Sequence, residues 1–345
     1  MAQINKSNEY FNTVLYTGNG GTNNITGVEF QPDWVWIKNR PDVRGHQIYD
    51  SVRGVTKVIG SDRTSAEATV GNGLTAFGSD GFTLGSDSNV NDNGDSHVSW
   101  NWLAGGTGVS NTDGSITSTV SANTTAGFSI VSFTNSGSGN RTVGHGLNAK
   151  PKMIIQHAIN DATNWLVYNE NLNSSPENYY LYLNTTNAVQ NITNIWGAGM
   201  TTTTFGINAG VGGTTSYINY CFAEKKGFSK FGSYTGNGST DGTFVYTGFK
   251  PAFVMVKRSD APEYWNILDT ARADVSNANP TDQVLYANDA SAEYSETQGI
   301  DLLSNGFKVR ESGAGWCNAS GGTYIYMCFA ENPLVGTNNI PATAR

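Results

Sequence analysis

The amino-acid sequence predicts an all-β protein built from three tandem, diverged β-sandwich domains. The first observation behind this prediction is the composition, with 41 glycines, 16 tyrosines and 8 tryptophans among 345 residues and only 14% charged residues. Residues that favour helices are scarce, whereas β-branched, aromatic and turn-forming residues are plentiful. The second observation is an internal repeat, in which four landmarks recur in the same order along the chain.

The first two landmarks are short strands. One ends in a glycine-rich turn, at residues 14–20, 130–137 and 231–238. The other follows a proline, at Pro32, Pro151 and Pro251. It is apolar on both faces, which is typical of a central strand covered on both sides, and a proline does least harm at the first residue of a strand.

The third landmark is an alternating strand, at residues 46–50, 165–169 and 265–269. Two copies continue into an Asp-x-x-Arg motif, formed by Asp50 with Arg53 and by Asp269 with Arg272, whereas the middle copy has Asn169 and Leu172. Because a catalytic pair would hardly be lost from one copy, we interpret these residues as ion pairs at strand ends.

The fourth landmark closes each copy with a Gly-Phe strand, a polar loop and an aromatic strand, the last at residues 98–104, 217–224 and 324–331. The repeats are therefore expected at residues 9–105, 126–226 and 227–333. Residues 106–125 form a connector rich in Gly, Ser and Thr, and the alternation at 116–120 suggests a strand there. The tail, residues 334–345, is expected to lie over the surface or to reach a neighbour.

Bulk properties exclude several classes of protein. The net charge is −8, and 20 scattered basic residues face 28 acidic ones, so nucleic acid is not an expected partner. The sequence contains no apolar run long enough for membrane insertion and no secretory signal, so we expect a soluble chain. The three cysteines, Cys221, Cys317 and Cys328, provide no disulfide framework, and Cys221 and Cys328, which lie at equivalent places in apolar strands, are expected to be small buried apolar residues.

Metal and cofactor chemistry is not predicted. The histidines, His46, His97, His145 and His157, have no carboxylate or cysteine nearby at a ligand spacing. An acidic loop offers weak calcium candidates at Asp87, Asn89, Asn91 and Asn93. Its register fails because Trp100 stands where a calcium loop needs a bidentate glutamate, so a solvated turn is the favoured interpretation.

Catalysis is not predicted either. Glycan hydrolysis needs two carboxylates at a fixed separation, yet no acidic position persists through the three copies: Glu224 and Glu331 match each other, but the first copy has Gly105. Recognition by loops remains, because sugars stack on exposed aromatic rings. The candidate ligand-binding residues lie near polar variable segments and are Trp196, Trp316, Tyr179, Tyr180 and Tyr294; packing between repeats or protomers is the alternative.

Several motifs are specific enough to indicate a family, namely residues 16–20, 30–38, 143–147, 220–224, 228–234, 248–254 and 329–333. Through them nearly the whole chain resembles uncharacterised structural proteins of tailed bacteriophages, especially phages of marine bacteria. The resemblance implies lectin-like or jelly-roll-like sandwiches in a tail fibre or another virion-surface component, made in the host cytoplasm. The implied partners are further copies of the chain, with a trimer as the first expectation, other virion proteins, and a host surface glycan or receptor.

Two further functions stay open. Because the first repeat begins near residue 9, the expected anchor to the particle is that repeat itself, another protein or a capsid lattice. The last possibility corresponds to a capsid decoration protein. A polysaccharide depolymerase is the third hypothesis, and it differs from the other two in requiring catalysis.

Overall fold

The computed structural model describes residues 4–197, 199–209, 214–273 and 279–335. Within these ranges the helical elements are single turns: η1 (Ser7–Glu9), α1 (Ser88–Asn91) and η2 (Pro176–Asn178). All other regular elements are strands, so the predicted all-β fold with sandwich layers is confirmed. None of the described helices has the length and apolar character needed to cross a membrane.

The first repeat is a two-layered sandwich. Its main sheet is antiparallel, in the order β1 (Phe11–Thr17), β9 (Ser96–Trp102), β3 (Trp34–Asn39) and β4 (Gln47–Asp50). The second layer is formed by β2 (Asn23–Thr26), β8 (Gly81–Leu84) and β7 (Leu74–Gly78), and a small ribbon by β5 (Lys57–Val58) and β6 (Ala68–Thr69). One face of the main sheet packs on the second layer, through residues such as Val35, Ile37 and Phe82.

The second repeat has the same strand order in its main sheet, with β12 (Phe128–Asn135), β19 (Thr215–Phe222), β14 (Met153–Ala158) and β15 (Leu166–Asn169). Its second layer consists of β13 (Gly139–Gly144) and β18 (Thr204–Ala209). The sheet is extended by β10 (Val109–Asn111) and β11 (Ser118–Asn123) at one edge and by β16 (Tyr179–Tyr182) and β17 (Gln190–Asn191) at the other. The residues between the first two repeats thus contribute strands to the sheet of the second.

The third repeat begins its main sheet in the same order, with β20 (Ser229–Thr235), β27 (Thr323–Pro333), β22 (Phe249–Arg258) and β23 (Trp265–Asp269). The sheet continues through β24 (Thr281–Tyr286), β25 (Tyr294–Leu303), β26 (Gly306–Val309) and β21 (Phe244–Tyr246). It curls into a nearly closed barrel around its own core.

The opposite faces of the three main sheets meet in one central core. Successive side chains of a strand point to opposite faces, so half of each central strand packs inside its own repeat and half packs against the other repeats. Trp34 of the first repeat stacks on Tyr220 of the second at 4.3 Å between ring centroids. The Phe329 ring of the third repeat lies 5.6 Å from Trp102 and 6.1 Å from Phe222.

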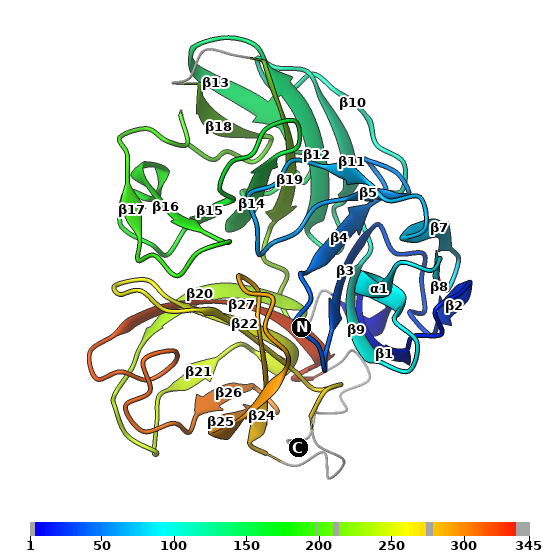
Figure 1. The fold of residues 1–345 in the computed structure, drawn as a ribbon. Coiled ribbons are helices and arrows are strands. Elements are labelled where there is room, and N and C mark those ends of the chain that lie inside the picture. Colours follow the sequence, from blue (N-terminus) through cyan, green and yellow to red (C-terminus); the bar gives the residue numbers. More distant parts are fainter. Residues whose placement is uncertain (1–3, 198, 210–213, 274–278, 336–345) are drawn as a thin grey trace.

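The three repeats therefore surround a common centre, as the three lobes in Figure 1 show. This arrangement explains why the residues after Pro32, Pro151 and Pro251 are apolar on both faces: the second cover is the other two repeats. The prediction of a proline at the first residue of the strand is wrong for Pro251, which is the third residue of β22 and lies at an irregularity of the ladder. A single body results, rather than three independent units on a string. Of the predicted tail, residues 336–345 lie outside the described residues.

Candidate functional site

Three equivalent hydrogen bonds join the repeats in a closed ring. The donors occupy the same position at the start of β4, β15 and β23, and each reaches a carbonyl oxygen of a neighbouring repeat. His46 Nε2 donates to Tyr286 O at 2.8 Å, Trp165 Nε1 to Gly60 O at 2.9 Å, and Trp265 Nε1 to Tyr182 O at 2.9 Å. The first repeat thus binds the third, the second binds the first, and the third binds the second.

A second ring is made by the backbone and is equally regular. The amide of Glu67 donates to Ile159 O at 2.9 Å, that of Val189 to Ser259 O at 2.8 Å, and that of Glu293 to Arg40 O at 2.7 Å. Each bond again crosses from one repeat to another, and the acceptors are equivalent in sequence. The two rings give the body an approximate threefold symmetry within one chain.

The histidines at these contacts are neutral structural groups. His46 Nδ1 accepts a hydrogen bond from Trp36 Nε1 at 2.8 Å, which leaves the proton on Nε2 for the bond to Tyr286 O. Burial lowers the pKa of His46 to about 3. His157 stacks on Trp165 at 4.3 Å and contacts Ser65 O at 3.0 Å, and burial lowers its pKa to about 4. Burial also lowers the pKa of His145 to about 4 and the pKa of His97.

Both predicted ion pairs are present, and both are buried. Arg53 Nε lies 2.6 Å from Asp50 Oδ2, and Arg272 Nε lies 2.7 Å from Asp269 Oδ2. The two aspartates also accept from neighbouring repeats, Asp50 from the Tyr220 hydroxyl at 2.8 Å and Asp269 from Trp100 Nε1 at 2.9 Å. These carboxylates therefore connect repeats.

The second repeat lacks the acid, and the third repeat lacks the corresponding donor. Met327 stands at the position of Trp100 and Tyr220, and Asn169 at the position of the aspartates. Methionine has no donor for a carboxylate, so a neutral side chain is the compatible partner. Both replacements, the asparagine at 169 and the methionine at 327, are present in the sequence. Their connection can be recognised only once the threefold arrangement shows that the two positions belong to the same contact.

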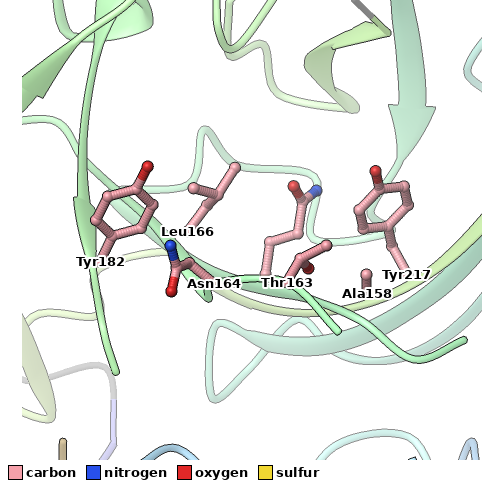
Figure 2. Close-up of a pocket in the computed structure, with 7 residues that line it drawn as sticks. Ala158, Thr163, Asn164, Leu166, Tyr182 and Tyr217 are labelled. Carbon is pink, nitrogen blue, oxygen red and sulfur yellow. The ribbon is translucent and has the colours of Figure 1, made fainter. Parts of the chain in front are cut away.

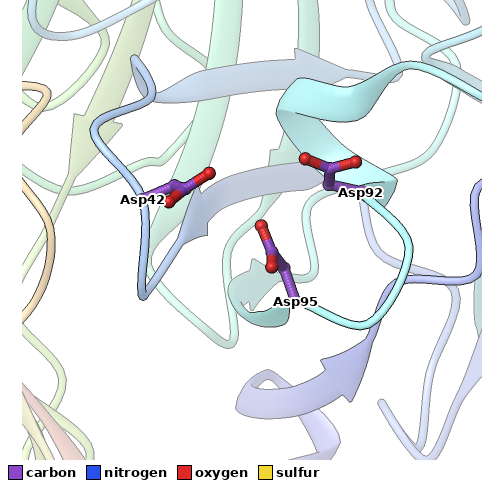
Figure 3. Close-up of side chains that lie close together, drawn as sticks. All are labelled: Asp42, Asp92 and Asp95. Atoms are coloured by element: carbon purple, nitrogen blue, oxygen red, sulfur yellow. The ribbon is translucent and has the colours of Figure 1, made fainter.

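Three carboxylates of the first repeat lie close together, and they come from two separate loops (Figure 3). The oxygens of Asp42, Asp92 and Asp95 are within 4.8 Å of one another. Arg44 forms an ion pair with Asp92 and lies 3.7 Å from Asp42, and Asn39 Nδ2 donates to Asp95 at 2.8 Å. The three acids offer hard ligands for a cation, but a guanidinium group already balances part of their charge.

The predicted calcium candidates serve the turn itself. Asp87 caps α1, where its side chain accepts from the amide of Asn89 at 3.2 Å. Asn91 is buried and donates to Gly21 O and Gly85 O, both at 2.7 Å. Sequence reasoning missed the acidic cluster of the neighbouring loops because Asp42 is remote in sequence from Asp92 and Asp95.

The predicted ligand-binding aromatics lie deeper than expected. Trp196, Trp316 and Tyr180 are buried within their own repeats, so the expectation of exposed rings is wrong for these three residues. Trp196 donates to Tyr179 O at 3.0 Å, which ties its loop to the sandwich. Trp196 and Trp316 lie in loops between strands, where their large rings fill the core, whereas Tyr180 lies in β16 and faces the core of its sandwich. Tyr179 and Tyr294 are half-buried.

The second repeat has a surface pocket of about 250 Å³ that is lined by residues of β14, β15, β16 and β19 and of the loop before β15 (Figure 2). Tyr182 and Tyr217 stand on opposite sides of it. The hydroxyl of Tyr182 lies 3.2 Å from that of Tyr180, and the two rings meet edge to face at 5.1 Å, which orients the Tyr182 ring. The lining residues are all uncharged: Gln156, Ala158, Thr163, Asn164, Leu166, Tyr182 and Tyr217.

Such a lining combines apolar ring faces with amide and hydroxyl groups, which suits a small neutral polar ligand. Sequence reasoning missed Tyr182 and Tyr217 because both lie inside regular strands, where alternation indicates packing rather than recognition. The predicted candidates Tyr179 and Tyr180 belong to the same strand as Tyr182, but they are not among the residues that line the pocket.

The search of curated proteins found no match, and the search of solved structures found none. The sequence model of one family, described as a domain of unknown function, matches residues 6–333. The chain therefore belongs to the DUF7483 family.

Proposed function

We propose that the chain is a non-catalytic structural protein of a tailed-phage virion and acts by binding, as a tail-fibre or receptor-binding component that recognises a host surface glycan or protein. The observation that carries this proposal is that the buried aspartates and histidines, which could act in catalysis, form structural contacts instead. The buried aspartates and histidines are engaged in contacts between or within repeats, whereas an uncharged pocket with two tyrosines opens at the surface. The sequence resemblance supports the virion setting.

Purified particles test this function directly. We expect the protein in their mass spectrum, an antibody label at the tail, and slower adsorption of phage to cells preincubated with the purified protein. Absence of the protein from purified particles would refute the proposal. Size measurement in solution tests the proposed homotrimer separately, since a homotrimer would have three times the chain mass of 36.9 kDa.

A capsid decoration protein is the second candidate, and the approximate threefold symmetry of the body favours it. A body with three equivalent sides fits a threefold position of a shell more readily than an asymmetric one. A label on the head would support this role and count against the tail. A polysaccharide depolymerase is the third candidate. The test for it is release of reducing ends from host exopolysaccharide, and we expect none.

A further inference from the structure

The pocket of the second repeat corresponds to a site at the same position in the first repeat and in the third. Side chains of the protein itself occupy both of these sites. The loop that precedes β4, β15 and β23 has the same length in each repeat, so Asn164 is equivalent to Tyr264 and to Gly45. The strand partners place Tyr182 opposite Leu166 and Tyr286 opposite Asn266 in the same register. The three sites can therefore be compared residue by residue.

In the third repeat a tyrosine of the chain itself occupies the site. The Tyr264 ring stacks on the Tyr286 ring with 4.1 Å between centroids and 21° between planes. Arg258 stands where the second repeat has Ala158, and its guanidinium is paired with Asp260 at 2.9 Å. The equivalent of the Tyr182 ring thus carries a second flat ring upon its face.

In the first repeat an arginine occupies the site. Cβ atoms added at Gly60 and Gly45, the equivalents of Tyr182 and Asn164, would lie 2.2 and 2.7 Å from the Arg63 guanidinium. Arg63 Nη2 donates to Gln47 Oε1 at 3.1 Å, which holds the flat group in place. Two repeats therefore fill this site with a planar side chain of their own, whereas the second repeat leaves it open.

We propose that the pocket of the second repeat binds one pyranose ring of a neutral glycan, stacked on Tyr182 where Tyr264 stacks in the third repeat. The volume of about 250 Å³ suits a single ring, since it lies below the range of drug-sized sites. The apolar face of a sugar stacks on a tyrosine ring, and the Asn164 and Gln156 amides and the Thr163 hydroxyl meet its hydroxyl groups.

The charges of the equivalent sites support a neutral ligand. Thr163 of the second repeat replaces Arg44 and Glu263, and Asn184 replaces Asp62, whose carboxylate lies beside Arg63 in the first repeat. An anionic sugar would find no cation in this lining, and its charge would be desolvated without compensation. This assignment rests on the proposed function only in its choice of a host glycan as the source of the ring.

The test compares the full chain with two variants that fill the pocket from opposite sides. Saturation-transfer NMR and titration calorimetry would use the methyl glycosides of glucose, galactose, mannose and N-acetylglucosamine, with glucuronic and sialic acids as anionic probes. We expect binding of at least one neutral glycoside, and at least tenfold weaker binding by Asn164→Tyr and Ala158→Arg. Tyr246→Ala, which removes an exposed tyrosine of the third repeat, is the matched control and should bind unchanged.

Thermal unfolding of each variant establishes that it is folded, and Tyr182→Ala provides a variant that removes the stacking platform without filling the pocket. No binding of the neutral probes by the wild-type chain, equal binding by Asn164→Tyr, or a preference for the anionic sugars would each overturn the assignment. Sugar binding by a protein absent from particles would refute the proposed function and leave the pocket assignment standing. Presence of the protein on particles without sugar binding would refute the pocket assignment and leave the proposed function standing.

Discussion

The three contacts between repeats share the same two rings of hydrogen bonds but differ in whether they contain a buried carboxylate. The first repeat meets the second through Tyr220 and Asp50, and the third meets the first through Asp269 and Trp100, so each of these contacts contains a buried carboxylate. At the equivalent positions between the second and third repeats stand Asn169 and Met327, which are both uncharged. The difference shows that a buried carboxylate occurs where an arginine and a donor from another repeat accompany it. In the remaining contact all three groups are replaced by uncharged side chains that donate nothing to a carboxylate at this place.

Removing the cation should have the largest effect. Arg272→Ala leaves the buried Asp269 without its cation at 2.7 Å and removes one of the two arginine partners of Glu293, which keeps Arg40. We expect a loss of about 3–5 kcal/mol in the free energy of unfolding, measured by urea denaturation. Leu172→Ala, at the equivalent position of the second repeat, removes only part of a half-buried apolar side chain and should cost about 1–2 kcal/mol. Equal losses would contradict the comparison.

Placing an acid in the neutral contact should cost nearly as much. Asn169→Asp buries a carboxylate that has Leu172 in place of the arginine and Met327 in place of the donor from another repeat. The Asn171 amide, which donates to Asn169 Oδ1 at 2.9 Å, does not neutralise its charge, and we expect a loss of roughly 3 kcal/mol. The triple variant Asn169→Asp/Leu172→Arg/Met327→Tyr introduces the full set found at the first contact and should recover most of this loss. A triple variant less stable than the single one would show that the three positions do not act as a unit.

Removing one donor should have a smaller effect. Tyr220→Phe deletes the hydroxyl that donates to Asp50 Oδ2 at 2.8 Å, and loss of a hydrogen bond to a charged group costs about 1.5–3 kcal/mol. Met327→Leu, at the equivalent position of the third repeat, conserves volume and should cost less than about 1.5 kcal/mol. The comparison is sharpened by measuring both changes in thermal and urea denaturation.

Acid should weaken the contacts that His46 and His157 make between repeats. Burial lowers the pKa of His46 to about 3 and that of His157 to about 4, so the unfolded chain binds more protons than the folded chain below about pH 6.5. The contribution of these neutral histidines to the free energy of unfolding is fully present above that pH. It falls as the pH decreases toward 4, by up to about 1.4 kcal/mol per pH unit for each histidine. His46→Gln keeps a donor and an acceptor and should reduce this slope, as measured by unfolding at pH 7, 6 and 5. An unchanged slope would exclude His46 as a source.

The repeat and the fold class could be predicted because both depend on local pattern. The alternation at residues 165–169 and the apolar runs after each proline are properties of single strands. The closed ring could not be predicted in this way, since Trp165 does not reveal from its neighbours that it donates to Gly60 O of another repeat. The pocket could not be predicted for the same reason. That Ala158 and Asn164 leave a space open becomes apparent only from the structure, in which Arg63 and Tyr264 fill the equivalent sites of the other repeats.

The buried Trp196 illustrates a further limit. Its loop is polar, which favours exposure, yet the ring packs in the core of the second sandwich and is 1% exposed. Whether a loop aromatic points inward depends on the space left by the opposing layer, and that space is set by residues far away in sequence.

Cooperative unfolding tests the central claim most directly, namely that the three repeats form one body with a shared core. Differential scanning calorimetry at pH 7 should show one transition, with a calorimetric enthalpy close to the van't Hoff enthalpy, because no repeat can lose its inner face without exposing the faces of the other two. Two or three separable transitions, each with its own van't Hoff enthalpy, would show that the repeats unfold independently and would contradict the claim.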